Sequence, residues 1–391
     1  MKVTLKPELL QWARHRAGLG VEGLAARFDA KPEHLERWTA RIIGWEKDGE
    51  LTFKQAEKLA QITHTAFGYL FLSQPPDERL PIPDLRTVGS VALARPSPDL
   101  LDVIYQSQRR QEWFREHQIA EEAEPLAFVG STPVGTDVKQ AAAALREQLR
   151  FHPSESRETT LDGVLREFCE AIETAGILVV RSGTVGNNTR RALKPEEFRG
   201  FALVDAYAPL VFLNAADFKA AQIFTLAHEL AHVWAGESAL SNPEYTMVPE
   251  QQRVEWFCNA VAAEYLVPLD GLKERLRRLR GTPAEVLATL RRHYRVSELV
   301  IMRRLLDAGE ISRLAFKQDY EARLASYRDA PQSKGGDFYR NQPGKIGHRF
   351  ATALIGSALE GKTLFRDAMA LLDMKKLATF EQFARNLHFT H

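Results

Sequence analysis

One short segment, residues 224–234, constrains the fold and the chemistry more than any other part of the chain. It contains the pattern His-Glu-x-x-His, formed by His228, Glu229 and His232, in an apolar stretch of helical character. On an α-helix, residues four positions apart lie on the same face, so the two imidazoles can bind one ion. Glu229 can then reach a metal-bound water without being a ligand. This arrangement is typical of zinc peptidases, in which the carboxylate takes a proton from water.

Composition excludes several classes of protein. The 391 residues carry a formal net charge of only +1, so the overall charge does not favour nucleic acid or a membrane surface. The two cysteines, Cys169 and Cys258, are too far apart and too few for a disulfide framework, which fits a reducing cytosol. Residues 1–10 lack the apolar core of a signal peptide, and no apolar run approaches the roughly 20 residues that span a bilayer. We therefore expect a cytoplasmic protein.

Residues 1–72 form a first predicted domain, built from short helices. Gly18 should end the first helix, and further helices are expected over 21–28, 33–38 and 52–62. Short helices joined by tight turns are typical of helix-turn-helix domains.

The order of these pieces resembles the Xre type of helix-turn-helix domain. The matching motifs are Ala13-Arg14-x-x-Ala17-Gly18, Leu24-Ala25, Trp45-Glu46-x-x-Gly49 and Leu59-Ala60. The chain departs from the pattern over 39–44, which reads as extra length before Trp45. Glu33 and Glu36 would also repel phosphate if the next helix entered a DNA groove. DNA binding and a role in dimerisation or partner docking therefore both stay open.

Residues 73–136 are predicted to be a proline-rich linker followed by a helix, and residues 137–330 a catalytic domain. Prolines within 75–98 favour extended chain, and a helix is expected over 99–117. In the catalytic domain the sequence predicts helices over 137–149 and 160–175 and strands over 176–180, 200–204 and 209–214. Asp217 is predicted to be the N-cap of the helix that carries His-Glu-x-x-His. An edge strand of such a sheet can hold an extended substrate by backbone pairing.

A catalytic zinc site needs a third protein ligand. The predicted helix over 250–265 offers Glu255 as this ligand. Asn259 lies on the same face of the helix and could form a hydrogen bond to a metal-ligating side chain without touching the metal. The alternative ligands are Glu250, Glu264 and Cys258. Glu264 lies on a different face from Asn259, and zinc bound by thiolate is more often structural than catalytic.

The two motifs together resemble the ImmA/IrrE family of metallopeptidases. They read Phe-Thr-Leu-Ala-His-Glu-Leu-Ala-His from residue 224 and Glu-x-x-Cys-Asn-x-x-Ala-Ala-x-x-Leu-Val-Pro from residue 255. The resemblance covers roughly residues 140–310 and implies Zn²⁺ held by His228, His232 and Glu255, with Glu229 as the general base. The chain departs from the family pattern at Ala231, Cys258 and Val261, all of which stay small or apolar. Residues 80–87 also resemble the connector in members with an Xre-type domain.

Two regions follow the site. Residues 272–304 are strongly basic and predict either a solvated helix face or a surface for nucleic acid or an acidic partner, with Ser297 capping a helix over 299–308. Residues 331–391 are predicted to be a glycine-rich linker and a C-terminal helical region.

The sequence therefore predicts an α+β, mostly helical protein with an N-terminal helix-turn-helix-like domain, a zincin-like metallopeptidase domain with a small sheet, and a C-terminal helical segment. The implied activity is zinc-dependent hydrolysis of a peptide bond in one specific protein, such as a repressor or another regulatory partner. The alternative is a DNA-binding transcriptional regulator or the antitoxin of a toxin–antitoxin pair, with the metal domain as a partner-binding scaffold. Tyr245, Tyr265 and His293 are equivalent candidates for stabilising the oxyanion, and the oligomeric state stays open.

Overall fold

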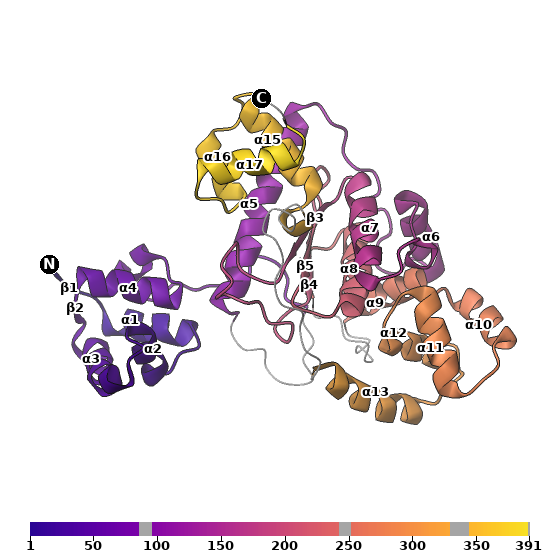
Figure 1. Cartoon of the computed structure of the whole chain (residues 1–391), viewed down its shortest axis with the longest axis horizontal. Coiled ribbons are helices and arrows are strands. Elements are labelled where there is room, and N and C mark those ends of the chain that lie inside the picture. Colours follow the sequence, from indigo (N-terminus) through magenta and orange to yellow (C-terminus); the bar gives the residue numbers. More distant parts are fainter. Residues whose placement is uncertain (86–95, 242–251, 329–343, 390–391) are drawn as a thin grey trace. The chain divides into compact units, whose positions relative to one another are not determined.

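The computed structural model describes residues 1–85, 96–241, 252–328 and 344–389, which belong to two compact units (Figure 1). The first unit comprises residues 1–81 and 91–102, and the second comprises residues 82–90 and 103–391. The fold is α+β and mostly helical, as the sequence predicts. No helix among the described residues combines the length and the apolar character needed to cross a bilayer.

The first unit packs short helices against a two-stranded antiparallel sheet. Its elements are β1 (Lys2–Thr4), α1 (Pro7–Arg16), α2 (Val21–Phe28), α3 (Leu35–Asp48), β2 (Glu50–Thr52) and α4 (Phe53–Thr63). The helix predicted over 33–38 is too short, because residues 39–44, interpreted as extra length, continue α3 without interruption as far as Asp48. The helix ends at Gly49, whose φ of 72° is a left-handed conformation that glycine adopts without strain.

The second unit is organised around a four-stranded sheet. Its strands are β3 (Leu178–Ser182), β4 (Gly200–Leu203), β5 (Leu210–Asn214) and β6 (Ala239–Ser241), in the order β3-β5-β4-β6. β3 pairs parallel with β5, and the other two pairs are antiparallel. The first three strands agree with the prediction. β6 was not predicted, because three residues carry too little periodicity to mark a strand.

The helix that carries the His-Glu-x-x-His pattern, α8 (Lys219–Ala235), is buried along almost its whole length. It packs against β4 and β5 of the sheet and against α6 (Val138–Leu149), α7 (Leu161–Thr174) and α9 (Arg253–Leu266), and these elements share one apolar core. The prediction that Asp217 caps α8 is wrong by one residue. Phe218 occupies the N-cap position, and Asp217 accepts the backbone N–H of Phe218 at 2.9 Å instead.

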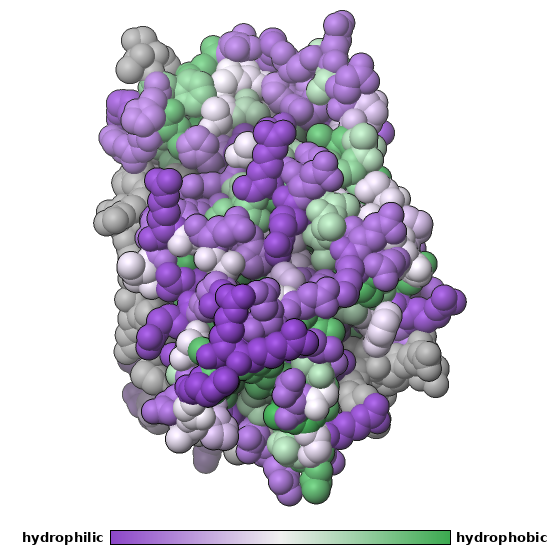
Figure 2. Space-filling view, turned by 90° about the vertical axis from the view of Figure 1, so that its right-hand side faces the viewer, coloured by the Kyte–Doolittle hydropathy of each residue, from purple (hydrophilic) through white to green (hydrophobic). Residues whose placement is uncertain are grey.

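The basic region forms α10 (Leu269–Arg278), α11 (Pro283–Tyr294) and α12 (Glu298–Asp307), followed by α13 (Arg313–Arg328). Ser297 caps α12, as predicted, by accepting the N–H of Val300. Several of the arginines form ion pairs with neighbouring carboxylates, for example Arg278 with Glu274. Figure 2 looks onto the side where α10 lies and shows mostly hydrophilic residues with small scattered hydrophobic spots.

The C-terminal helices α15 (His348–Leu359), α16 (Phe365–Leu371) and α17 (Leu377–Asn386) pack against the long helix α5 (Pro98–Ala120). Arg110 of α5 pairs with Asp373 at 2.7 Å, and Trp113 of α5 contacts Phe350 of α15. Gln111 donates to the backbone carbonyls of Leu203 and Ala208, both at 2.9 Å. The C-terminal region is thus part of the same packed unit as the sheet.

Candidate metal centre and active site

Helix α8 places His228, Glu229 and His232 in the interior of the second unit. All three side chains are fully buried, since apolar residues occupy the remaining faces of the helix. Ionisable side chains in such a position need a partner, because desolvating a charge or a polar group is costly. The partner comes from α9, which packs directly against α8.

The structure brings His228, His232 and Glu255 together, with one ligand atom of each within 4.8 Å of the others. The two Nε2 atoms of the histidines lie 3.1 Å apart. Glu255 places Oε1 3.1 Å from the Nε2 of His232 and Oε2 3.4 Å from that of His228. Tetrahedral ligands at zinc bond lengths of about 2.0–2.1 Å lie about 3.3 Å from one another. The three donors therefore have the spacing of zinc ligands.

The charge states of these side chains also suit a divalent cation. Burial alone would raise the pKa of Glu255, but the two histidines outweigh it and hold this pKa at about 2. Burial lowers the pKa of His228, against the opposing effect of Glu255. One anionic carboxylate beside a neutral imidazole is the donor set that a metal ion needs.

Glu229 is buried beside this cluster without being part of it. Among the described residues, neither carboxylate oxygen of Glu229 has a partner at hydrogen-bond distance. Burial raises the pKa of Glu229 well above its ordinary value, and the negative charge of Glu255 raises it further. A buried carboxyl with no hydrogen-bond partner among the described residues is costly, and such groups concentrate at functional sites.

Two residues of the sheet complete the site, and neither was assigned a role from the sequence. Gly200 of β4 and Ser241 of β6 are direct neighbours in the antiparallel pair. The Ser241 hydroxyl lies 3.4 Å from the Nε2 of His232, and it lowers the pKa of Glu229 against the larger effect of burial. A Cβ atom at position 200 would lie 2.8 Å from Oε1 of Glu229. The absence of a side chain at position 200 therefore leaves space for the carboxylate of Glu229.

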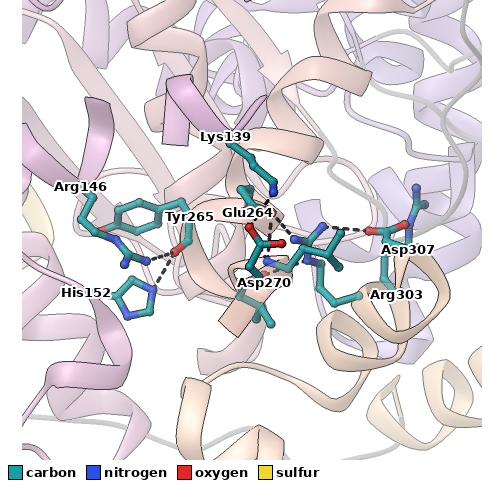
Figure 3. Close-up of polar contacts among 11 residues, drawn as sticks. Lys139, Arg146, His152, Glu264, Tyr265, Asp270, Arg303 and Asp307 are labelled. Carbon is teal, nitrogen blue, oxygen red and sulfur yellow. Dashed lines mark hydrogen bonds and ion pairs between the residues drawn. The ribbon is translucent and has the colours of Figure 1, made fainter. Parts of the chain in front are cut away.

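The two other candidate ligands among the described residues, Glu264 and Cys258, do not join the cluster. Glu264 is wrong as an alternative ligand, because it forms an ion pair with Arg304 of α12 (Figure 3 shows Glu264 among its polar neighbours). Cys258 is buried among apolar side chains, and burial raises the pKa of its thiol well above the ordinary value. Glu250 and Tyr245 lie outside the described residues.

Two further side chains that were considered for oxyanion stabilisation lie elsewhere. The Tyr265 hydroxyl donates to the carbonyl of Phe151 at 2.6 Å, and its own carbonyl accepts from His152 and Arg146 (Figure 3). His293 lines a separate cavity between α10 and α11.

A cavity of about 350 Å³ lies between α6, α8, α9 and α12. Its wall includes the apolar side chains of Phe224 and Trp256, and Arg303 and Asp307 pair at its rim (Figure 3). Asn259 also lines it, and the proximity of this amide raises the pKa of His228, although burial is the larger effect. Asn259 thus links the cavity to the metal-ligand cluster.

Residues 172–306 match the family model of the IrrE N-terminal-like domain. This range contains the whole cluster and Glu229, and the match supports, at family level, the resemblance to the ImmA/IrrE metallopeptidases. Residues 346–386, which include all of α15, α16 and α17, match a domain of unknown function, DUF8813. Comparison with curated proteins finds no match.

Substituting Gly200 by alanine is expected to lower the turnover of a peptide substrate about 10- to 100-fold, because a small misplacement of a catalytic group is costly. The new Cβ would lie 2.8 Å from Oε1 of Glu229 and 3.0 Å from the carbonyl oxygen of Phe212, so the carboxylate must move. Zinc content should stay unchanged, since no ligand is touched. Gly271→Ala is the matched control, because its Cβ would meet nothing closer than 3.7 Å. Normal turnover in Gly200→Ala would contradict the assignment.

Proposed function

We propose that this chain is a zinc-dependent metalloendopeptidase that cuts a peptide bond in one specific regulatory protein. The observation that carries the proposal is the convergence of two imidazole nitrogens and one carboxylate beside a fully buried glutamate that has no hydrogen-bond partner within the described part of the chain. The match of residues 172–306 to a metallopeptidase family supports the same reaction class.

The zinc ion would be held by His228, His232 and Glu255. Asn259 lies close to His228 and can orient its imidazole ring without touching the metal. A bound zinc ion would supply Lewis acidity, which polarises a peptide carbonyl and lowers the pKa of water.

Glu229 is proposed to act as the general base and then as the general acid. Its carboxylate takes the proton of the attacking water and later delivers it to the leaving amine. Burial favours this role, because the raised pKa lets the side chain hold a proton between the two steps. The nearby Ser241 hydroxyl favours the ionised carboxylate, since it lowers the pKa of Glu229 against the larger effect of burial, and Gly200 leaves the carboxylate space.

The proposed substrate is a protein that presents an extended segment with an apolar side chain. The cavity lined by Phe224 and Trp256 lies next to Asn259 and would accept such a side chain. We propose that the flanking regions select the partner, which is a repressor or another regulatory protein. DNA binding through residues 1–72 stays a prediction, to be tested by salt-dependent binding of promoter DNA to the full chain.

The proposal is tested by metal removal together with partner capture. Chelation should abolish the cleavage of a partner that co-purifies from the native host, and added zinc should restore it. The Glu229→Gln variant, purified in parallel with its zinc quantified, should retain the same partner uncut. A partner that is bound but never cut by the zinc-loaded wild type would instead favour the scaffold alternative.

A further inference from the structure

The outer side of the edge strand β6 is occupied by residues 83–85. These residues belong to the segment 80–88, which we call the connector. Asp84 forms a parallel β-bridge with Leu240, the central residue of β6. The N–H of Leu240 donates to the carbonyl of Pro83 at 2.9 Å, and the N–H of Leu85 donates to the carbonyl of Leu240 at 3.1 Å. Both backbone polar groups of Leu240 are thus used by residues 83–85.

This edge lies directly beside the metal-ligand cluster. Ser241, the next residue of β6, places its hydroxyl 3.4 Å from the Nε2 of His232. The inner side of β6 is already paired with β4, so only the outer side is available to a further strand. An extended peptide that added to the sheet at this edge would need the same two groups of Leu240.

The connector is a weak occupant of this edge. Pro81 and Pro83 have no N–H to donate, which limits how many ladder bonds the segment can form. Ile82 is the only buried side chain of residues 81–85, at 7% exposure, whereas Pro83 and Asp84 are exposed. A competing strand can displace the two backbone hydrogen bonds to Leu240, because each backbone hydrogen bond contributes only modestly to stability.

We propose that the outer edge of β6 is the docking edge for an extended peptide substrate, and that residues 83–85 occupy it until the substrate displaces them. The connector then acts as an autoinhibitory strand in cis. This inference rests on the proposed peptidase function for its catalytic consequence, but the exchange of strands at the edge can be measured without catalysis.

The first test uses a free connector peptide, residues 80–88, carrying a fluorophore. It is titrated into the zinc-loaded full chain in the Glu229→Gln background, which prevents cleavage. Leu85→Pro removes the N–H that donates to Leu240, while Leu85→Ala keeps that N–H and serves as the matched control. The peptide should bind Leu85→Pro about 5- to 10-fold more tightly than Leu85→Ala, because losing one hydrogen bond frees the edge. A second variant, Ile82→Ser, should show the same gain by removing the buried anchor.

The second test follows the catalytic consequence in the chain with Glu229 intact. Hydrolysis of the partner protein that co-purifies with Glu229→Gln should rise in Leu85→Pro by a similar factor, and the free connector peptide should inhibit it. Equal peptide binding by all variants, or lower stability without tighter binding, would show that the connector only completes the sheet and would overturn the proposal. Cleavage of the chain within residues 80–90 would overturn it as well, since the connector would then be a substrate. A gain in binding with no hydrolysis by any variant would support the docking edge and count against the peptidase.

Discussion

Replacing Glu229 by glutamine is expected to lower kcat/KM for peptide hydrolysis about 1,000-fold, within the range of general acid–base catalysis. Glutamine has almost the same shape as glutamate, but its amide cannot take a proton from water. Zinc should remain bound, because Glu229 is not among the three side chains whose ligand atoms converge. The fold should be retained or slightly stabilised, because an unpartnered buried carboxyl is replaced by a neutral amide.

The measurement compares turnover, zinc per chain and melting temperature in wild type, Glu229→Gln and Glu237→Gln. Glu237 lies just beyond the end of α8 and is exposed, so its substitution controls for the loss of one carboxylate near the helix. Glu237→Gln should keep wild-type activity. Full activity in Glu229→Gln would remove the proposed mechanism, and loss of zinc in that variant would show that Glu229 is a ligand.

The parts of the site that could be predicted from sequence are those encoded within one element. The four-residue spacing of His228 and His232 is meaningful on any α-helix, so no tertiary information is needed. Helical periodicity likewise placed Glu255 and Asn259 on one face of the next helix. Both residues lie on α9, and because α9 packs against α8, Glu255 meets the two histidines there.

The parts that could not be predicted depend on contacts between distant segments. Glu264 was a candidate ligand from the sequence of α9 alone. Its carboxylate pairs with Arg304 of α12, and this contact between two helices cannot be predicted from the pattern of either helix. Gly200 and Ser241 meet Glu229 only because β4 and β6 are neighbours in the sheet. The pairing of the connector with Leu240 joins residues that no periodicity relates.

The helix predicted over residues 33–38 was too short, because the segment that follows it was interpreted as extra length. The segment Thr-Ala-Arg-Ile-Ile-Gly looks like an insertion when it is compared with the Xre pattern, but it has no residue that forces a helix to end. Ile42 and Trp45 lie one turn apart on the buried face of α3, and their burial favours a continuous helix. A longer helix alters the surface that this unit would present to DNA, so DNA binding requires direct measurement.

Substituting Glu255 by alanine is expected to weaken zinc binding by more than about 100-fold, since even residues that only orient metal ligands contribute 10- to 100-fold. Two imidazoles would remain, and the buried negative charge that favours a divalent cation would be lost. Hydrolysis should fall with the zinc content. The stabilisation that wild type gains from zinc, about 2.7 kcal/mol at a zinc concentration 100 times Kd, should disappear in the variant.

The matched control is Glu264→Gln, two and a half turns further along the same helix. This change should leave zinc affinity intact but lower the free energy of unfolding by about 1–3 kcal/mol, because the buried Arg304 guanidinium loses a carboxylate partner. The two variants are thus expected to differ in zinc affinity, which Glu255→Ala loses and Glu264→Gln keeps. Zinc retained at full affinity by Glu255→Ala would transfer the role of third ligand to another residue, and Cys258→Ala would then test the remaining described candidate.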